Sequence, residues 1–333
     1  MTPRSLLAAA RSRPVLADGA MGTQLQDAGL DGGGCGELWN VEQPDRVAAI
    51  HRAYLDAGAD VLLTNTFGGS RLALARHGLA DRTVELNRAG AELAVRAASP
   101  GTGAGAGVGG AAGSPASARG AAESGPGPER RAWVLGDMGP TGALLAPLGE
   151  ADPAAVEAAF QEQAAALLAG GVDGILVETM TALDELRCAV RGAKRAGAGL
   201  VVASVAFDAT KVGFRTMMGE TPEQAVAAMQ QEETDVVGAN CGSGLDMGAY
   251  AELARQYRAL APDAIVWIKA NAGTPRLEPA PASGSSHRVL YDGAPEAMAA
   301  GAAALVEAGA SIVGGCCGTT PAHIRAFARA LKR

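Results

Sequence analysis

Aromatic residues are scarce in this sequence, because Phe, Trp and Tyr together make up only 4% of its 333 residues. Proteins that bind single-stranded nucleic acids stack bases on aromatic side chains, so this scarcity argues against that class. Basic residues are not in excess either: 28 Lys and Arg face 35 Asp and Glu, and the net charge is −7. A protein that binds the phosphate backbone of a nucleic acid usually has more Lys and Arg than Asp and Glu. We therefore expect no nucleic-acid partner.

Long apolar runs and clustered cysteines are also missing. No run approaches the roughly 18 apolar residues that a membrane span needs. The apolar patch at 6–10 is followed at once by Arg11 and Arg13, so it is too short for a secretory signal. Five scattered cysteines are too few for a scaffold built on disulfides. We expect a soluble cytoplasmic protein without a membrane partner.

Glycine, in contrast, is abundant with 46 residues, and part of the surplus lies in one segment. Between 99 and 128, all but three of thirty residues are Gly, Ala, Ser, Thr or Pro. Such a composition buries too little apolar surface to offset the entropy cost of ordering the chain. We interpret it as a low-complexity flexible insertion in one domain that spans 1–333, because one pattern continues on both sides. An interdomain linker is the alternative.

That pattern is an alternation of short β-rich runs with longer helical stretches. Continuous apolar runs are typical of parallel strands that are buried on both faces. Eight strand–helix pairs predict the α/β class and a single (β/α)8 barrel of the TIM type, with a doubly wound open sheet as the alternative. The predicted strands are 15–18, 60–65, 132–136, 174–178, 200–206, 236–239, 265–269 and 311–314. The predicted helices are 44–57, 83–98, 153–170, 182–196, 222–232, 246–260, 295–308 and 321–332.

Three of the five cysteines directly follow predicted strands, at the rim where barrel enzymes hold their active sites. Cys241 follows the sixth strand, and Cys316 and Cys317 follow the eighth. Three thiolates with an open fourth position form the ligand set of a catalytic zinc site, and sulfur favours zinc over Mg2+ or Ca2+. Inert buried cysteines and redox chemistry, including a disulfide between the adjacent pair, remain open interpretations.

A zinc ion with an open position suits a thiol substrate, because zinc holds a thiol as the more nucleophilic thiolate. Asp18 and Glu178 also follow strands, and either carboxylate could accept hydrogen bonds from a substrate ammonium group. The alternative is that they cap neighbouring loops or pair with arginines.

Two other functions fit parts of the same rim. Lys269 could form a Schiff base in an aldolase-like lyase, with Gly314 and Gly315 in a phosphate-binding turn. A non-enzymatic zinc–thiol redox sensor is the second. The segment 271–289 is rich in Pro and Ser, and we expect an irregular loop that acts either as a lid or as a mobile surface segment.

Several sequence motifs appear in a characteristic order along the chain: LADGAMGTQL, ADVLLTNTFGGSRLAL, GDMGPTG, VDGILVETM, GANCG, KANAG and GGCCGTTPAHI. In these motifs the sequence resembles the homocysteine S-methyltransferase domain family, and within it the homocysteine-binding module of cobalamin-dependent methionine synthase. The resemblance runs from about residue 14 to the end, interrupted by the insertion.

The resemblance implies a (β/α)8 barrel whose zinc ligands are Cys241, Cys316 and Cys317. It implies substrate-binding carboxylates at Asp18 and Glu178, with the backbone of Gly19 and Ala20 near the substrate carboxylate. Asn271 matches the family's residue at the fourth zinc position in the absence of substrate. Here Ala270 replaces the family's usual proline before it.

The implied activity is the methylation of homocysteine, held as a zinc thiolate, to give methionine. The residues in these motifs are closest to those of the cobalamin-linked branch of the family, which favours methylcobalamin on a separate corrinoid protein as the methyl donor. S-methylmethionine, S-adenosylmethionine and a betaine are the alternative donors, and another thiol is the alternative acceptor.

Overall fold

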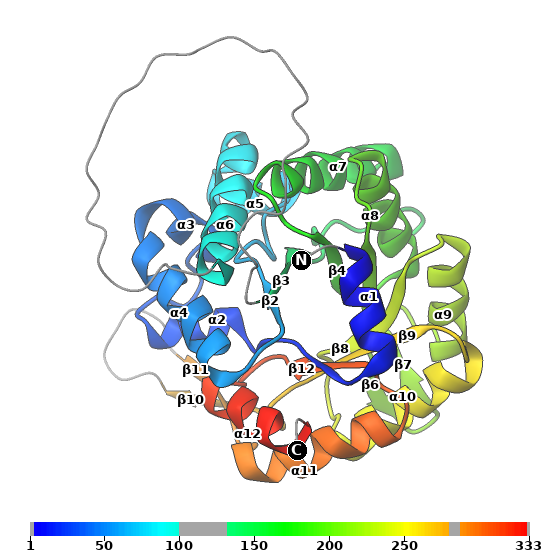
Figure 1. Cartoon of the computed structure of the whole chain (residues 1–333). Coiled ribbons are helices and arrows are strands. Elements are labelled where there is room, and N and C mark those ends of the chain that lie inside the picture. The colour runs from blue at the N-terminus through cyan, green and yellow to red at the C-terminus, as the bar shows by residue number, and fades with distance from the viewer. Residues whose placement is uncertain (1–2, 100–131, 280–286, 332–333) are drawn as a thin grey trace.

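Eight parallel strands form a closed barrel in the computed structural model, which describes residues 3–99, 132–279 and 287–331 (Figure 1). The strand order is β1-β12-β9-β8-β5-β4-β3-β2, and a bridge between Ala17 and Val61 joins the two ends. This confirms the predicted (β/α)8 barrel. Its strands are β1 (Val15–Leu16), β2 (Val61–Leu63), β3 (Trp133–Met138), β4 (Gly174–Met180), β5 (Val201–Val205), β8 (Val236–Asn240), β9 (Ile265–Ala270) and β12 (Ile312–Gly315).

A ring of helices surrounds the barrel, and each predicted helix lies within one residue of its observed bounds. Local signals explain the accuracy: Thr221 and Gln224 form a capping box at the start of α9, with Pro222 in the first turn. The helices are α4 (Pro44–Ala57), α6 (Thr83–Ala98), α7 (Pro153–Ala169), α8 (Leu183–Arg195), α9 (Pro222–Gln231), α10 (Met247–Leu260), α11 (Pro295–Glu307) and α12 (Pro321–Leu331). None of the described helices is long and apolar enough to cross a membrane.

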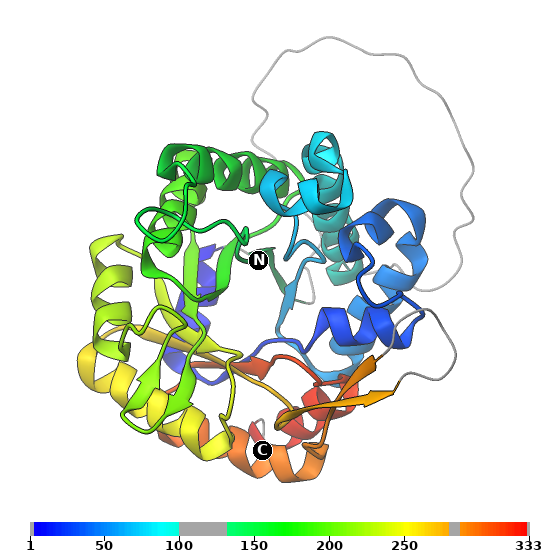
Figure 2. The same ribbon diagram turned by 180° about the vertical axis from the view of Figure 1, so that it is seen from behind.

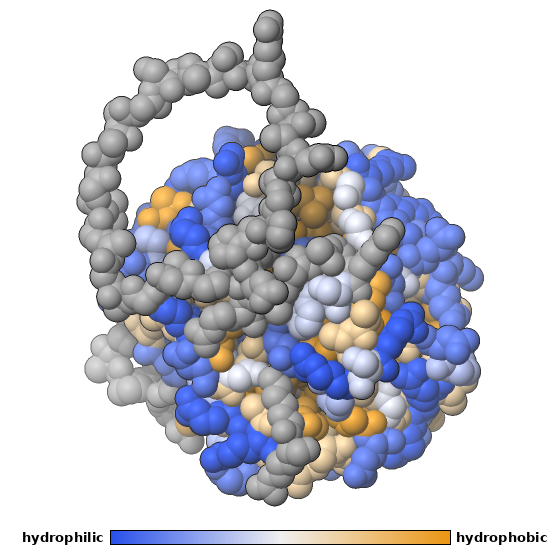
Figure 3. Space-filling model, in the orientation of Figure 1, coloured by the Kyte–Doolittle hydropathy of each residue, from blue (hydrophilic) through white to orange (hydrophobic). Residues whose placement is uncertain are grey.

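The core has two layers, because successive strand residues point to opposite faces. Outward-facing residues such as Leu62 and Val177 pack against the helices. Inward-facing residues such as Leu135 and Trp267 fill the barrel interior together with Leu6 of α1 (Pro3–Ser12). Helix α1 therefore covers the amino-terminal end of the barrel (Figure 1). Hydrophilic residues dominate the outer helices seen from that side (Figure 3).

Several short elements were not predicted from the sequence. They are α1, α2 (Met21–Asp27), α3 (Trp39–Glu42), α5 (Arg71–Leu74), the turns η1 (Gly36–Leu38), η2 (Ala75–His77) and η3 (Ala80–Arg82), and the strands β6 (Asp208–Thr210), β7 (Gly213–Arg215), β10 (Pro275–Pro279) and β11 (His287–Tyr291). The strands β6–β7 and β10–β11 form two antiparallel hairpins on the side opposite α1 (Figure 2).

The expectation of an irregular loop at 271–289 was wrong, because β10 pairs with β11 across it. Prolines argued against a strand there, but Pro275 and Pro279 occupy its two ends, where proline is tolerated. Residues 280–286 lie outside the described residues. The insertion predicted at 99–128 also lies outside them, apart from Ser99.

Candidate metal centre and adjoining cavity

The structure brings the three rim cysteines together. Cys241 follows β8, and Cys316 and Cys317 follow β12, two positions away in the barrel. Their three Sγ atoms lie within 4.8 Å of one another, and the Sγ atoms of Cys241 and Cys317 are 3.8 Å apart. All three are free thiols, as are Cys35 and Cys188, which are not part of the cluster.

The spacing of these sulfurs fits a tetrahedral zinc ion. Zinc–sulfur bonds of about 2.3 Å at tetrahedral angles place two sulfur atoms about 3.8 Å apart. That is the distance between Cys241 and Cys317. A disulfide would need the two sulfurs at about 2.05 Å. Three such thiols leave one tetrahedral position for a further ligand.

A strained turn directs Cys241 toward the other two cysteines. Its φ of +55° lies in the left-handed region, which residues other than glycine rarely adopt. Gly242 follows with a φ of +94°, and a Cβ there would come within 1.7 Å of the Phe207 carbonyl oxygen. The Tyr250 hydroxyl donates a hydrogen bond of 2.8 Å to the Cys241 carbonyl and fixes the turn.

Backbone hydrogen bonds hold the Cys316–Cys317 turn against the end of β9. The Cys316 N–H donates to the Ala270 carbonyl at 2.7 Å, and the Ala272 N–H donates to the Cys317 carbonyl at 2.9 Å. The Thr319 hydroxyl donates to the Cys316 carbonyl at 2.7 Å. The turn is thus fixed from both sides, and both sulfurs keep a defined direction.

Contacts among the three thiols, together with burial, raise the pKa of each thiol when no cation is present. Contact with Cys316 lowers the pKa of Cys241, but contact with Cys317 and burial outweigh it and raise the pKa to about 11. Contact with Cys241 lowers the pKa of Cys317, yet Cys316 and burial raise it to about 12. Contact with Cys241 also raises the pKa of Cys316. A bound divalent cation has the opposite effect, because metal binding releases thiol protons.

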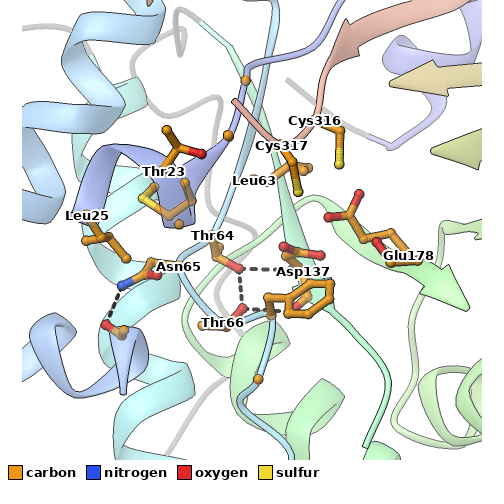
Figure 4. Close-up of a pocket in the computed structure, with 18 of the residues that line it drawn as sticks. Thr23, Leu25, Leu63, Thr64, Asn65, Thr66, Asp137, Glu178, Cys316 and Cys317 are labelled. Carbon is orange, nitrogen blue, oxygen red and sulfur yellow. Dashed lines mark hydrogen bonds between the residues drawn. The ribbon is translucent and has the colours of Figure 1, made fainter. Parts of the chain in front are cut away.

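A cavity of about 380 Å³ opens beside the cysteines at the carboxyl ends of the strands. Figure 4 shows the side chains of Asp137 and Glu178 facing the same space as Cys316 and Cys317. The lining residues that bear on the chemistry are Gly19, Ala20, Asp137, Glu178, Cys241, Lys269, Cys316 and Cys317.

Lys269, which lines this cavity, forms an ion pair with Asp18. The Lys269 Nζ lies 3.4 Å from Asp18 Oδ1, and the two side chains are only 3% and 2% exposed. Asp18 Oδ2 accepts a hydrogen bond of 2.8 Å from the Leu63 N–H. Burial raises the pKa of Asp18 to about 6, against the lowering effect of Lys269. Both oxygens of Asp18 are engaged within the protein, and Asp18 does not line the cavity.

The charge on Lys269 bears on the lyase alternative. Burial lowers the pKa of Lys269, but the carboxylates of Glu178 and Asp18 outweigh burial and raise it above its usual value. A lysine must be neutral to attack a carbonyl and form a Schiff base. The geometry therefore makes Lys269 a fixed counter-charge and disfavours the aldolase-like interpretation.

Glu178 and Asp137 both line the cavity, and each carries one buried oxygen without a hydrogen-bond partner among the described residues. These oxygens are Glu178 Oε2 and Asp137 Oδ1. Burial raises the pKa of both carboxyl groups. An unpartnered buried carboxyl oxygen is costly, so both groups could accept a hydrogen bond from a bound ligand. The sequence analysis gave Asp137 no role; its position near the carboxyl end of β3, which matches that of Glu178 in β4, was the available signal.

Gly19, Ala20 and Asn271 are held close to the cysteine turns. A Cβ on Gly19 would come within 2.8 Å of Thr319 Oγ1, and the Ala20 N–H donates to that atom at 3.1 Å. Asn271 Nδ2 donates to the Gly242 carbonyl at 3.0 Å. Its Oδ1 is buried without a partner among the described residues, and Asn271 does not line the cavity.

Tyr291 reaches the metal centre from β11, a contribution that the sequence did not reveal. Its ring covers Gly318, where a Cβ would come within 2.2 Å of Tyr291 Cγ. Burial, together with the nearby Cys317, raises the pKa of the Tyr291 hydroxyl. No local pattern marked this contact, because it depends on the unpredicted β10–β11 hairpin.

Comparisons with known proteins give one consistent family. The sequence profile described as homocysteine S-methyltransferase matches residues 15–331. The chain is 37% identical to a methionine synthase of Mycobacterium tuberculosis over 98% of its own length, and 35% identical to a methionine synthase of Mycobacterium leprae. It spans about a quarter of the length of these two relatives, since it covers 25% of each.

Solved structures show the same fold. The homocysteine methyltransferase MmuM of Escherichia coli, in its metallated form, superposes with a TM-score of 0.68 at 22% identity. The alignment covers 97% of this chain and 98% of MmuM. The oxidized form of MmuM gives the same TM-score and covers 95% of both chains.

Proposed function

Because this chain belongs to the homocysteine S-methyltransferase family, we propose that it transfers a methyl group to the sulfur of homocysteine and thereby forms methionine. The observation that carries the proposal is one cavity lined by three thiols, whose sulfurs lie within 4.8 Å of one another, and by two carboxyl groups that each have a buried unpaired oxygen. In this proposal the whole chain, 1–333, is a homocysteine-binding barrel with an insertion at about 99–128.

The metal site is the first part of the proposal. Cys241, Cys316 and Cys317 would hold the zinc ion. Bound zinc would supply a cationic centre that favours the thiolate form of the substrate sulfur. Asn271 would occupy the fourth coordination position of the zinc ion when substrate is absent. Its buried Oδ1, which has no partner among the described residues, supports this role.

The substrate ammonium group is the second part. Glu178 and Asp137 each offer one unpaired carboxylate oxygen, so the pair can accept hydrogen bonds from one ammonium group. Asp18 contributes indirectly, because it pairs with Lys269, which lines the cavity as a fixed counter-charge. The backbone of Gly19 and Ala20 lines the same cavity and would face the substrate carboxylate.

The reaction itself makes few demands on proton transfer. The substrate sulfur donates an electron pair to the methyl carbon while the bond from that carbon to the leaving group breaks. The protein has to bind and orient the two reactants in line, which is the main source of acceleration in such a displacement. The lining of the cavity fits this requirement, since it contains no histidine among the described residues.

For the donor we favour methylcobalamin carried by a separate corrinoid protein. A second cavity, of about 550 Å³, adjoins the first and shares Phe67 and Thr179 with it. The exposed apolar side chains of Leu144, Leu148 and Met217 line this second cavity. An exposed apolar patch at the mouth of a site is typical of a surface that binds a protein. A small donor such as S-methylmethionine, S-adenosylmethionine or a betaine is the alternative.

One experiment tests acceptor, metal and donor together. The purified protein is assayed for methionine formation from homocysteine with each donor, including a methylated corrinoid protein, and its zinc content is measured. We expect one zinc ion per chain, with activity and zinc both lost in Cys316→Ala and both retained in Cys188→Ala. Methionine formation that persists in Cys316→Ala without zinc would refute the metal-based proposal.

A further inference from the structure

Strand β4 contains a β-bulge where it borders the cavity. Its pairing with β5 is regular as far as Val177 and resumes at Met180 with one extra residue on β4. Side chains alternate between the two faces of a regular strand, and a bulge interrupts this alternation. Glu178 and Thr179 therefore both line the cavity although they are adjacent, and Met180 packs in the outer layer of the core as Val177 does.

Thr179 occupies this bulge in a conformation that threonine rarely adopts. Its φ is +59°, in the left-handed region, where a residue with a branched Cβ is an outlier. Such a backbone is strained and persists only where the surrounding structure holds it, and strained residues of this kind cluster at functional sites. Glycine would adopt the same φ without strain. Because the chain has threonine here, other residues have to hold the bulge in place.

The side chain of Asn240, at the end of β8, holds Thr179 from two sides. Its Oδ1 accepts a hydrogen bond of 3.0 Å from the Thr179 N–H, and its Nδ2 donates one of 2.7 Å to Thr179 Oγ1. The same Oδ1 accepts a hydrogen bond of 2.5 Å from the Ser204 hydroxyl, and Nδ2 also lies 3.7 Å from Cys316 Sγ. Both lone pairs and both N–H groups of this buried amide are thus engaged, which fixes its position.

We propose that Asn240 is a positioning residue for homocysteine: it holds the bulge at Thr179 and thereby keeps Glu178 directed at the substrate ammonium group. This inference rests on the proposed function. Glu178 and Thr179 are joined by the peptide group whose N–H Asn240 binds. Rotation of Thr179 to an ordinary negative φ would turn this peptide group relative to the rest of the strand, and Glu178 would be displaced with it.

Asp137, the other carboxyl group at the cavity, is held independently of the bulge. Its N–H donates to Thr64 Oγ1 at 2.9 Å, and its carbonyl accepts a hydrogen bond of 2.8 Å from Thr66 Oγ1 (Figure 4). Asp137 and Glu178 can bind one ammonium group together only while Glu178 keeps its place relative to this fixed partner. Binding groups have to be held within about 0.5 Å of their productive geometry, so loss of the bulge should weaken substrate binding.

The test measures the Kd of L-homocysteine for the zinc-loaded protein by isothermal titration calorimetry, without any methyl donor. We expect Asn240→Ala to raise the Kd about tenfold, the effect of losing one charge-assisted hydrogen bond. In a Thr179→Gly background the same substitution should raise the Kd less than about threefold, because glycine keeps the left-handed φ without help from Asn240. An equal increase in the two backgrounds overturns the inference.

Asn87→Ala is the matched control. It removes another buried amide, whose Nδ2 donates to the Gly69 and Thr83 carbonyls at 2.7 Å each, and Asn87 does not line the cavity. We expect its Kd to equal that of the wild type. Zinc content is measured in all samples, since Asn240 also contacts Cys316. Loss of zinc from Asn240→Ala overturns the inference, because the amide would then act on the metal centre and not on Glu178.

Crystal structures of the wild type and Asn240→Ala give a readout that needs no substrate. We expect Thr179 to leave the left-handed region in the variant and Glu178 to be displaced from the cavity, and an unchanged bulge overturns the inference. Failure of the proposed function looks different. The wild-type protein itself would then not bind homocysteine, while the two crystal structures would still show whether Asn240 holds the bulge.

Discussion

Removal of the Lys269 ammonium should destabilise the fold in a way that depends on pH. Lys269 is the charged partner of Asp18, and Glu178 and Asp137 also act on its charge. Lys269→Met keeps most of the length of the side chain and its apolar packing but deletes the charge. Loss of one partner from a buried ion pair costs about 3–5 kcal/mol, because the remaining charge stays buried and unpaired. We expect a loss of that size in the free energy of unfolding at about pH 8.

The sign of the pH dependence follows from Asp18. Its pKa is raised to about 6 in the folded protein, above the value of the unfolded chain, and Lys269 keeps it from rising further. A carboxyl with a raised pKa contributes stability that is fully present below its unfolded pKa and is lost as pH rises through its folded pKa. In Lys269→Met the folded pKa moves higher still. At about pH 5 the carboxyl is then protonated and uncharged, so the cost should shrink to about 1–2 kcal/mol.

Urea unfolding of wild type and variant in identical buffers at both pH values measures this effect, because changes shared by the two proteins cancel in the difference. The double variant Asp18→Asn/Lys269→Met should recover most of the stability at about pH 8, since it removes both charges. A stability loss that is equal at the two pH values, or larger at low pH, would contradict this account of the buried charges.

Two further predictions concern His51 and Glu178. Burial lowers the pKa of His51 to about 4, so its contribution to stability is full above about pH 6.5 and is lost as pH falls toward 4, by up to about 3 kcal/mol. His51→Leu should therefore gain stability relative to wild type between pH 7 and pH 5 in urea unfolding, and a constant difference would count against the buried neutral imidazole. Glu178→Gln should raise KM for homocysteine about tenfold or more with a smaller change in kcat, because it weakens a charge-assisted hydrogen bond to the substrate ammonium. Glu185→Gln, a buried carboxylate that accepts hydrogen bonds from Thr141 instead, is the control, and equal KM values in the two variants would refute the role of Glu178.

The parts of the structure that depend on local patterns could be predicted from the sequence. Apolar strand runs and capping residues such as Thr221 act over a few positions, so the barrel and its helix bounds followed directly. The cysteine cluster could also be predicted, because the carboxyl ends of parallel strands share one rim.

Features that depend on distant partners could not be predicted. Lys269 suggested Schiff-base chemistry from its position alone, and only its pairing with Asp18, 251 residues away, shows it as a fixed charge. The packing of Tyr291 against Gly318 depends on a hairpin whose pairing is not apparent from its proline-rich sequence. In both cases the environment of the side chain depends on a contact with residues that are distant in the sequence.

Helix α1 has a consequence for the order of events in the proposed reaction. Leu6 is fully buried in the barrel interior, and the Ser5 hydroxyl accepts a hydrogen bond of 2.9 Å from Trp133 Nε1, so one end of the barrel is closed. Homocysteine and the methyl donor must then use the same opening. A large donor above the cavity would block that opening, which dictates a kinetic sequence: homocysteine binds first, the donor second, and methionine departs only after the spent donor has left.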